Sequence, residues 1–348
     1  MSGLRLLASK KSPWTIAWRF SFVVVVLAAL IWYVDHIGWD VVRDHAAKPG
    51  WATALVLFLL GVAEAAVDSV ALQRTMTQSV SIQYLYVVNQ AGALLNRFIP
   101  LESGEVLKGA LISRRVPTQS AISGTILYNY LFKLAKPITC MLALGTGLLF
   151  GSPEVRHLSL LVLPAAFLSF LPYVGLKLLI RFGLGRIFVK LVHLVGFGKK
   201  NPEKLVNGAR EVDELVGKFW RDRRSDYLTV LGLQIGGRLF SWASWYLLIY
   251  EIDKAYDLPT SSLIWTATII MGYIVSVLPS RLGTTEAGGW AVFKVLGLDP
   301  IIGLTATSLM TLRAVSVNGL SALCLVFFDT RKRRADADGE EAEVITRR

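Results

Sequence analysis

Long apolar runs separated by short polar segments dominate the chain, and their lengths predict its main elements. A helix needs roughly 20 apolar residues to cross a bilayer, because the hydrocarbon core is about 30 Å thick and each residue adds about 1.5 Å. Runs of this kind occupy 16–34, 51–72, 121–150, 158–180, 226–250 and 301–328. No small-residue cleavage site follows the first run, which favours an uncleaved anchor over a signal peptide. The pattern therefore predicts an all-α, polytopic integral membrane protein.

Proline and glycine interrupt two further apolar stretches, at 85–115 and 261–298, whose apolar pieces are too short to span a bilayer. The first contains N-R-F-I-P-L-E-S-G-E-V-L-K-G and the second V-L-P-S-R-L-G-T-T-E-A-G-G-W. Both interruptions have a Pro-x-x-x-Gly spacing followed by a glutamate: Pro100, Gly104 and Glu105 in the first, Pro279, Gly283 and Glu286 in the second. Such paired interruptions in two halves of a membrane protein are typical of transporter binding regions.

Each interrupted stretch is predicted to be a re-entrant helical hairpin that enters the membrane, breaks near its proline and leaves by the same face. A break at that depth is tolerated only where protein or water surrounds it. The order span, span, hairpin, span describes 16–150 and again 158–328, starting from opposite faces. The sequence therefore predicts an inverted repeat whose two hairpin tips meet near the midplane.

Basic segments agree with this topology, because positively charged loops between spans stay cytoplasmic. The N-terminal segment 1–15, Arg74, the pair Arg114 and Arg115, and the loop 181–225 all fall on one side. We expect one transmembrane domain at 16–328 and a charged tail at 329–348 without regular structure. Both termini are then cytoplasmic.

The loop 181–225 is the largest polar segment and carries eleven Lys or Arg residues against five Asp or Glu. Its part 185–195 is apolar and basic together, which is typical of a helix lying on an anionic lipid surface. A solvated cytoplasmic connector is an equally good interpretation.

Composition excludes other classes of protein. Of 348 residues 53% are hydrophobic and 18% charged, too apolar a mixture for a soluble domain. The net charge is +12, but the basic residues lie between apolar segments, so the charge does not indicate nucleic-acid binding. Cys140 and Cys324 fall within predicted spans, and the four histidines match no metal-ligand spacing. We expect no disulfide, metal or cofactor.

Ionisable residues within the apolar segments are candidates for function, because each costs a few kcal/mol at the bilayer centre unless it faces protein or water. The basic ones are Arg97, Lys108, Lys133, Lys136, Arg238, Arg281 and Arg313. The acidic ones, which are also candidate proton carriers, are Glu64, Asp68, Glu105 and Glu286. One interpretation is that these charges pair and hold helices together. The other is that the surplus of bases binds an anion.

Interrupted helices also offer free backbone N–H groups where the second half-helix begins, after Ser103 and after Thr284. Such N-termini favour phosphate or carboxylate. The candidate substrate site therefore also includes Gly104, Gly283 and Thr285, and the breaks at Pro100 and Pro279 are the candidate hinges.

At these motifs the sequence resembles the transmembrane domain of lysylphosphatidylglycerol synthase-like proteins, a flippase-like family. The motif residues are Pro100, Gly104 and Glu105 with Pro279, Gly283 and Glu286, and the resemblance covers about 16–328. It implies a location in the bacterial inner membrane and a flippase for aminoacylated phosphatidylglycerol or, in one branch, a link to hopanoid lipids. The loop of about 45 residues between spans is too short for a catalytic core, so we expect no synthase activity.

The combined expectation is a lipid translocase, not an enzyme, that moves an anionic or aminoacylated phospholipid or a related amphiphile such as a hopanoid. No phosphate-binding loop motif is present, so an ion gradient or the lipid gradient would drive transport. One alternative is a non-transporting partner of a lipid-modifying enzyme, and a less favoured one is a membrane enzyme acting on a lipid phosphate. Expected partners are the lipid substrate, anionic lipid at 181–225, a lipid-modifying enzyme and a second copy of the chain.

Overall fold

The computed structural model describes residues 49–98, 103–182, 202–275 and 284–346, and this part of the chain is all-α, as predicted. The predicted first span, the breaks at Pro100 and Pro279, and all of 185–195 lie outside it. The helices are α4 (Gly50–Thr75), α5 (Ile82–Phe98), α6 (Ser103–Ile112), α7 (Thr118–Phe150), α8 (Pro153–Leu168), α9 (Leu171–Phe182), α11 (Pro202–Asp222), α12 (Arg224–Ile252), α13 (Leu258–Val275), α14 (Thr284–Val295) and α15 (Pro300–Thr346).

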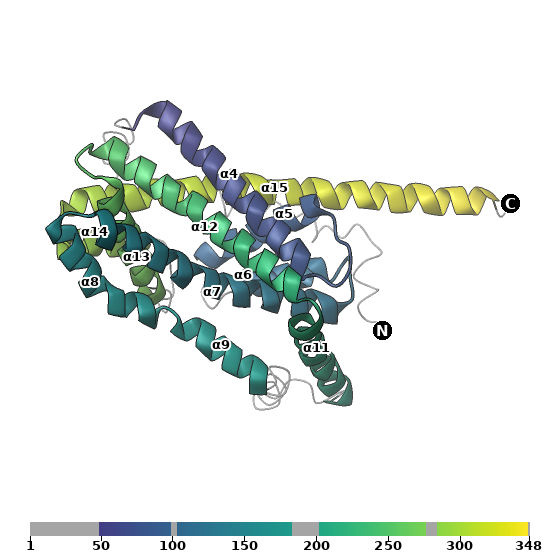
Figure 1. Cartoon of the computed structure of the whole chain (residues 1–348). Coiled ribbons are helices and arrows are strands. Elements are labelled where there is room, and N and C mark those ends of the chain that lie inside the picture. The colour runs from purple at the N-terminus through teal and green to yellow at the C-terminus, as the bar shows by residue number, and fades with distance from the viewer. Residues whose placement is uncertain (1–48, 99–102, 183–201, 276–283, 347–348) are drawn as a thin grey trace.

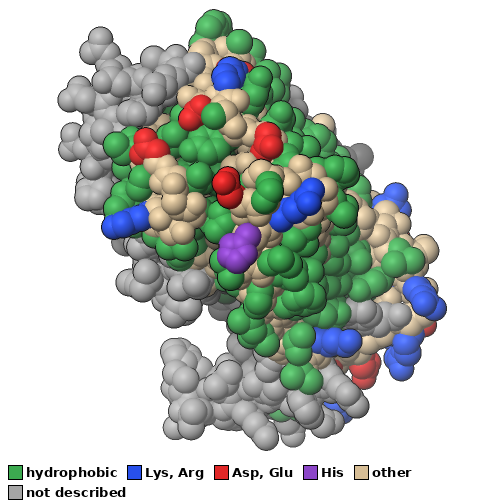
Figure 2. Space-filling model, turned by 60° about the vertical axis from the view of Figure 1, so that its left-hand side comes forward, with side chains coloured by type: hydrophobic (Ala, Val, Ile, Leu, Met, Phe, Trp, Pro, Cys, Tyr) green, Lys and Arg blue, Asp and Glu red, His purple; other side chains and the backbone are tan. Residues whose placement is uncertain are grey.

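Four helical stretches within the described residues are long and apolar enough to cross a membrane: Gly50–Thr75, Thr118–Phe150, Pro153–Leu178 and Pro300–Cys324. They correspond to four of the predicted spans. Helix α12 covers the predicted span 226–250 and is 29 residues long, but it is not among these four. Figure 2 shows one face of the molecule, on which hydrophobic side chains form broad areas of the kind that contact lipid.

The predicted span 158–180 is divided between α8 and α9. Pro172 explains the division, because its ring excludes a helical hydrogen bond to the carbonyl four residues earlier, which is that of Leu168, the last residue of α8. Ser169 ends α8 by donating a hydrogen bond to the carbonyl of Ala166. The span is therefore a bent pair of helices.

Helices α4 and α12 lie side by side and run in opposite directions at the centre of the fold (Figure 1). Arg223, just before α12, donates hydrogen bonds to the carbonyls of Arg74 and Met76 at the end of α4. These are the last carbonyls of α4, which have no helical donor of their own. The start of α12 is thereby joined to the end of α4.

Helices α5 and α6 fold back on each other, and Tyr84 in the first turns of α5 donates to the carbonyl of Leu111 near the end of α6. Glycine allows their backbones to approach closely: a Cβ on Gly104 would collide with the carbonyl of Gly92. Gly289 of α14 and Gly303 of α15 make a second close approach, since a Cβ on either would meet the other's carbonyl oxygen.

The principal contacts repeat between two groups of four helices. The helices correspond in order: α4 to α12, α5 to α13, α6 to α14 and α7 to α15. Wherever two of these eight helices make a principal contact, their counterparts are in contact as well. For example, α5 packs on α15 and α13 packs on α7. The two interrupted stretches therefore hold equivalent places in the packing.

Two segments differ from their predicted form. The connector 181–225 contains α11, which buries Val212, Val216 and Phe219, the last two of them against Leu127 of α7. Their spacing places them on one helix face. The tail expected to lack regular structure continues α15 to Thr346 and projects away from the other helices (Figure 1). Its many Ala, Glu, Arg and Lys residues favour a helix that the preceding span has already begun.

Candidate functional site

Helix α6 begins at Ser103, as the interruption predicted, and Asn96 of α5 holds its first turn. The Asn96 side-chain oxygen accepts a hydrogen bond from the backbone N–H of Gly104 at 2.7 Å. Its amide nitrogen donates to Oε1 of Glu105 at 3.1 Å. One asparagine therefore satisfies a free N–H of the helix start and also orients the first acidic side chain.

Glu105 is the centre of a polar cluster inside the helical bundle, which we call the hairpin cluster: Asn96, Glu105, Lys108 and Asn129. Lys108 Nζ lies 2.8 Å from Oε1 of Glu105, and Asn129 Nδ2 of α7 donates to Oε2 at 2.6 Å. The Lys108 side chain is 5% exposed and that of Glu105 17%. The cluster thus offers a carboxylate and an ammonium group side by side, with the carboxylate still partly accessible.

Aromatic and amide groups surround the ammonium of Lys108. Its Nζ lies 5.3 Å from the ring centre of Tyr128, whose hydroxyl accepts from Asn89 Nδ2 at 3.4 Å. Asn89 and Tyr128 are both buried. A cation over an aromatic ring is attracted to it, so Tyr128 helps to hold Lys108 in place.

A second cluster, which we call the inter-half network, joins α4 to α12 and α15. Arg238 Nη2 lies 2.5 Å from Oδ2 of Asp68 and 3.3 Å from Oε1 of Glu64. Arg313 Nη2 lies 3.1 Å from Oε2 of Glu64, and its Nε donates to the carbonyl of Leu57 at 2.8 Å. Glu64 and Asp68 share one face of α4, as their spacing predicted.

The inter-half network corrects one premise of the sequence argument. Within it, two carboxylates face two guanidinium groups, so the expected positive surplus does not arise there. The guanidinium groups of Arg238 on α12 and Arg313 on α15 are directed at carboxylates of α4. The interpretation that buried charges pair and hold helices together therefore applies to these four residues.

Helix α7 carries the two predicted lysines near its middle. Lys136 Nζ lies 4.5 Å from the ring centre of Phe132 and 5.7 Å from that of Tyr273. Arg238 also lies over Phe132, at 4.5 Å. Lys133 is half-buried. Phe132 thus links α7 to the inter-half network through a shared aromatic ring.

Helix α14 begins at Thr284, again as predicted, and Glu286 is its third residue, as Glu105 is in α6. Thr311 Oγ1 of α15 donates to Oε1 of Glu286 at 2.8 Å. This donor lies 25 residues after its glutamate, and Asn129 lies 24 residues after Glu105. The two acidic helix starts are therefore built alike, each with a polar donor from the following long helix.

The remaining predicted residues lie around these centres or outside the described part. Arg97 is half-buried in the last turn of α5, and Thr285 is half-buried at the start of α14. Pro100, Pro279, Arg281 and Gly283 lie outside the described residues. No group of three His, Cys, Asp or Glu that would hold a metal ion occurs in the part of the chain that the structure describes.

The sequence pattern did not predict a role for four residues around Glu105 and Glu286: Asn96, Asn129, Tyr128 and Thr311. A polar side chain inside an apolar run was the available signal for the two asparagines. Tyr128 and Thr311 carry no such signal, because tyrosine and threonine are common in membrane helices.

A family model described as the lysylphosphatidylglycerol synthase TM region matches residues 16–321, which is most of the chain and agrees with the resemblance of the two motifs. No curated protein and no solved structure shows a significant match to the chain.

Proposed function

The chain belongs to the family of the lysylphosphatidylglycerol synthase transmembrane region, and on that premise we propose that it is a lipid translocase. Its substrate is an anionic or aminoacylated phospholipid, or a related amphiphile such as a hopanoid, which it moves across the bacterial inner membrane unchanged. Membership of the family links the protein to lipid metabolism in a membrane.

The hairpin cluster is the observation that carries this proposal. Paired charges of opposite sign at the start of an interrupted helix match a headgroup that contains both a phosphate and an amine. Lys108 suits the phosphate, and Glu105 suits the amine. The 17% exposure of the Glu105 side chain leaves it within reach of a ligand.

The packing supports a mechanism of alternating access. We infer that the two groups of helices with equivalent contacts are the halves of an inverted repeat, each with a hairpin that re-enters the membrane from its own face. The inter-half network then holds one arrangement of the halves, because Arg238 and Arg313 belong to one half and Glu64 and Asp68 to the other. Rocking of the halves would break these ion pairs and form others.

We infer that Glu286 is the candidate proton carrier of the second interrupted stretch. It occupies the place in α14 that Glu105 occupies in α6, is 3% exposed, and accepts a hydrogen bond from the hydroxyl of Thr311. A buried ionisable residue in a membrane helix is a candidate for function by default.

Transport in proteoliposomes tests the proposal. Acyl-labelled anionic, zwitterionic and aminoacylated phospholipids are incorporated, and a membrane-impermeant quencher reports how much of each reaches the outer leaflet. We expect the wild-type protein to move at least one anionic or aminoacylated lipid faster than protein-free vesicles, and Glu105→Gln to abolish the difference. Equal rates with and without protein for every lipid would contradict transport.

A rigid, non-transporting partner of a lipid-modifying enzyme is the second candidate, and the charge balance of the inter-half network favours it. A network without unpaired charge holds helices together and has no need to change. In the same vesicles, this alternative predicts lipid binding at the hairpin cluster without movement between leaflets.

A further inference from the structure

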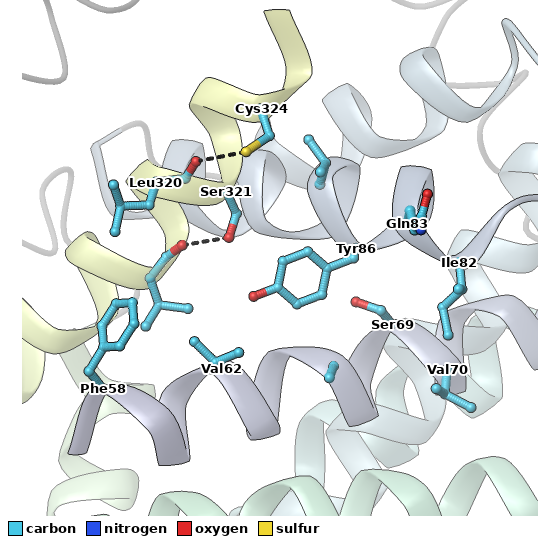
Figure 3. A pocket seen from close by; sticks show the side chains of 13 residues that line it. Phe58, Val62, Ser69, Val70, Ile82, Gln83, Tyr86, Leu320, Ser321 and Cys324 are labelled. Atoms are coloured by element: carbon cyan, nitrogen blue, oxygen red, sulfur yellow. Dashed lines mark hydrogen bonds between the residues drawn. The ribbon is translucent and has the colours of Figure 1, made fainter. Parts of the chain in front are cut away.

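An apolar cavity of about 510 Å³ lies between α4, α5 and α15 (Figure 3). Phe58 and Val62 of α4, Val87 of α5 and Leu320 of α15 contribute to its walls, and no lining residue is charged. Its volume falls within the range of about 300–1,000 Å³ that is usual for small-molecule sites. The cavity is separate from the hairpin cluster, which it does not include.

We propose that this cavity binds an acyl chain of a membrane phospholipid. Two of its walls, α4 and α15, are among the helices long and apolar enough to cross the membrane. At that depth the surrounding medium is hydrocarbon, so an apolar cavity fills with lipid chains and offers water nothing to bind. The acyl chain of the lipid is then buried against apolar side chains.

Polar groups at one end of the cavity identify how the lipid lies. Ser69 near the end of α4 and Gln83 and Tyr86 near the start of α5 line that end, and Figure 3 shows the Tyr86 side chain reaching into the cavity. The Gln83 amide and the Tyr86 hydroxyl are donors suited to the ester oxygens of a glycerolipid, whereas the Ser69 hydroxyl donates to the carbonyl of Ala65. The lipid therefore comes from the leaflet where α4 is connected to α5, with its chain ends towards Phe58.

The cavity shares a wall with the inter-half network. Val317 lines the cavity one turn after Arg313 on α15, and both side chains lie against Gly61 of α4. A Cβ on Gly61 would be 2.9 Å from Val317 Cγ2 and 3.0 Å from Arg313 Nε. An acyl chain in the cavity thus contacts the helices that the network joins. This assignment rests on the proposed function in treating the bound lipid as the substrate.

Photo-crosslinking tests the site directly. The full chain is reconstituted in vesicles that contain phosphatidylglycerol with a diazirine in its acyl chain, and crosslinked peptides are mapped by mass spectrometry. We expect crosslinks at 58–70 and 317–324. Ala66→Trp fills the cavity and should lower them about tenfold, the effect of excluding roughly two chain methylenes. Leu161→Trp, on the exposed face of α8, is the matched control and should leave them unchanged.

Ile82→Trp, at the exposed rim on α5, provides a second variant should Ala66→Trp fold poorly. A thiol reagent gives an independent measure, because Cys324 lines the cavity and is exposed whereas Cys140 is fully buried. Labelling of Cys324 should slow when long-chain phospholipid replaces short-chain detergent.

Crosslinks that are unchanged by both tryptophans would overturn the proposal. If the crosslinks behave as expected but no lipid crosses the bilayer, the chain site stands and the proposed transport function fails.

Discussion

The hairpin cluster and the inter-half network both hold carboxylates at similar burial, yet different groups satisfy them. In the inter-half network, each acid meets a guanidinium group from another helix, and the charges balance. In the hairpin cluster, Glu105 is held by two asparagines as well as by Lys108.

The difference lies in what satisfies each carboxylate. A carboxylate bound by guanidinium groups of distant helices stabilises the packing of those helices, and removing one partner leaves a buried charge. A carboxylate held by neutral amides keeps its orientation and can still bind a cation from outside. On this account, buried charge has a structural role in the inter-half network and forms the proposed ligand site in the hairpin cluster.

Arg238→Ala should have the largest effect on stability. It leaves Asp68 without its guanidinium partner at 2.5 Å, and losing one partner of a buried pair costs about 3–5 kcal/mol. Thermal unfolding in detergent measures the loss. Replacing the pair together, as Arg238→Met with Asp68→Leu, should restore much of it, whereas equal stability of Arg238→Ala and the wild type would remove the structural role of the network.

Glu105→Gln should affect lipid binding more than folding. It removes the ionic bond to Lys108 at 2.8 Å and keeps one oxygen, which can accept from Asn96 or from Asn129 but not from both. A hydrogen bond to a charged group contributes about 1.5–3 kcal/mol, so lipid affinity should fall roughly 10- to 100-fold. Lipid titration of the purified protein measures this. A loss of thermal stability equal to that of Arg238→Ala would show that both clusters have the same structural role.

Gly104→Ala tests the backbone contact that positions the hairpin cluster. The new Cβ would collide with the carbonyl of Gly92, so α5 and α6 must separate at a cost of about 1–3 kcal/mol. Gly109→Ala is the matched control on the same helix, because nothing lies within 4 Å of its Cβ position. The melting temperatures of the two variants should differ clearly; identical values would mean that the close approach is not needed.

Glu286→Gln should have the smallest effect on stability, within about 0.5 kcal/mol, because the amide oxygen still accepts from Thr311. Its effect should be on coupling: the transport rate of the variant should no longer respond to an imposed pH gradient. A wild-type rate that is already indifferent to the gradient would exclude Glu286 as a proton carrier.

The lengths of the apolar runs, and their interruption by proline and glycine, predicted the helices that depend on local pattern alone. Helices α4, α7 and the start of α15 follow from apolar length, and the starts of α6 and α14 follow from the Pro-x-x-x-Gly interruptions. The division of α8 from α9 was also contained in the sequence, at Pro172, but was overlooked because apolar length was counted without its prolines.

The pairing of side chains could not be predicted, because it depends on which helices become neighbours. Arg238 and Arg313 looked like a free surplus until α12 and α15 were placed against α4. Asn96 and Asn129 gained their roles only when α5, α6 and α7 met around Glu105. Helix α11 was missed for a related reason: its short apolar face is significant only where α7 covers it.

Native mass spectrometry of the protein released from gentle detergent tests the difference between the two clusters most directly. The wild type is compared with Glu105→Gln and with the paired replacement Arg238→Met with Asp68→Leu. We predict that an anionic or aminoacylated lipid stays bound to the wild type and to the paired replacement, and is lost from Glu105→Gln. Lipid retained by Glu105→Gln but lost from the paired replacement would place the headgroup at the inter-half network and contradict this account.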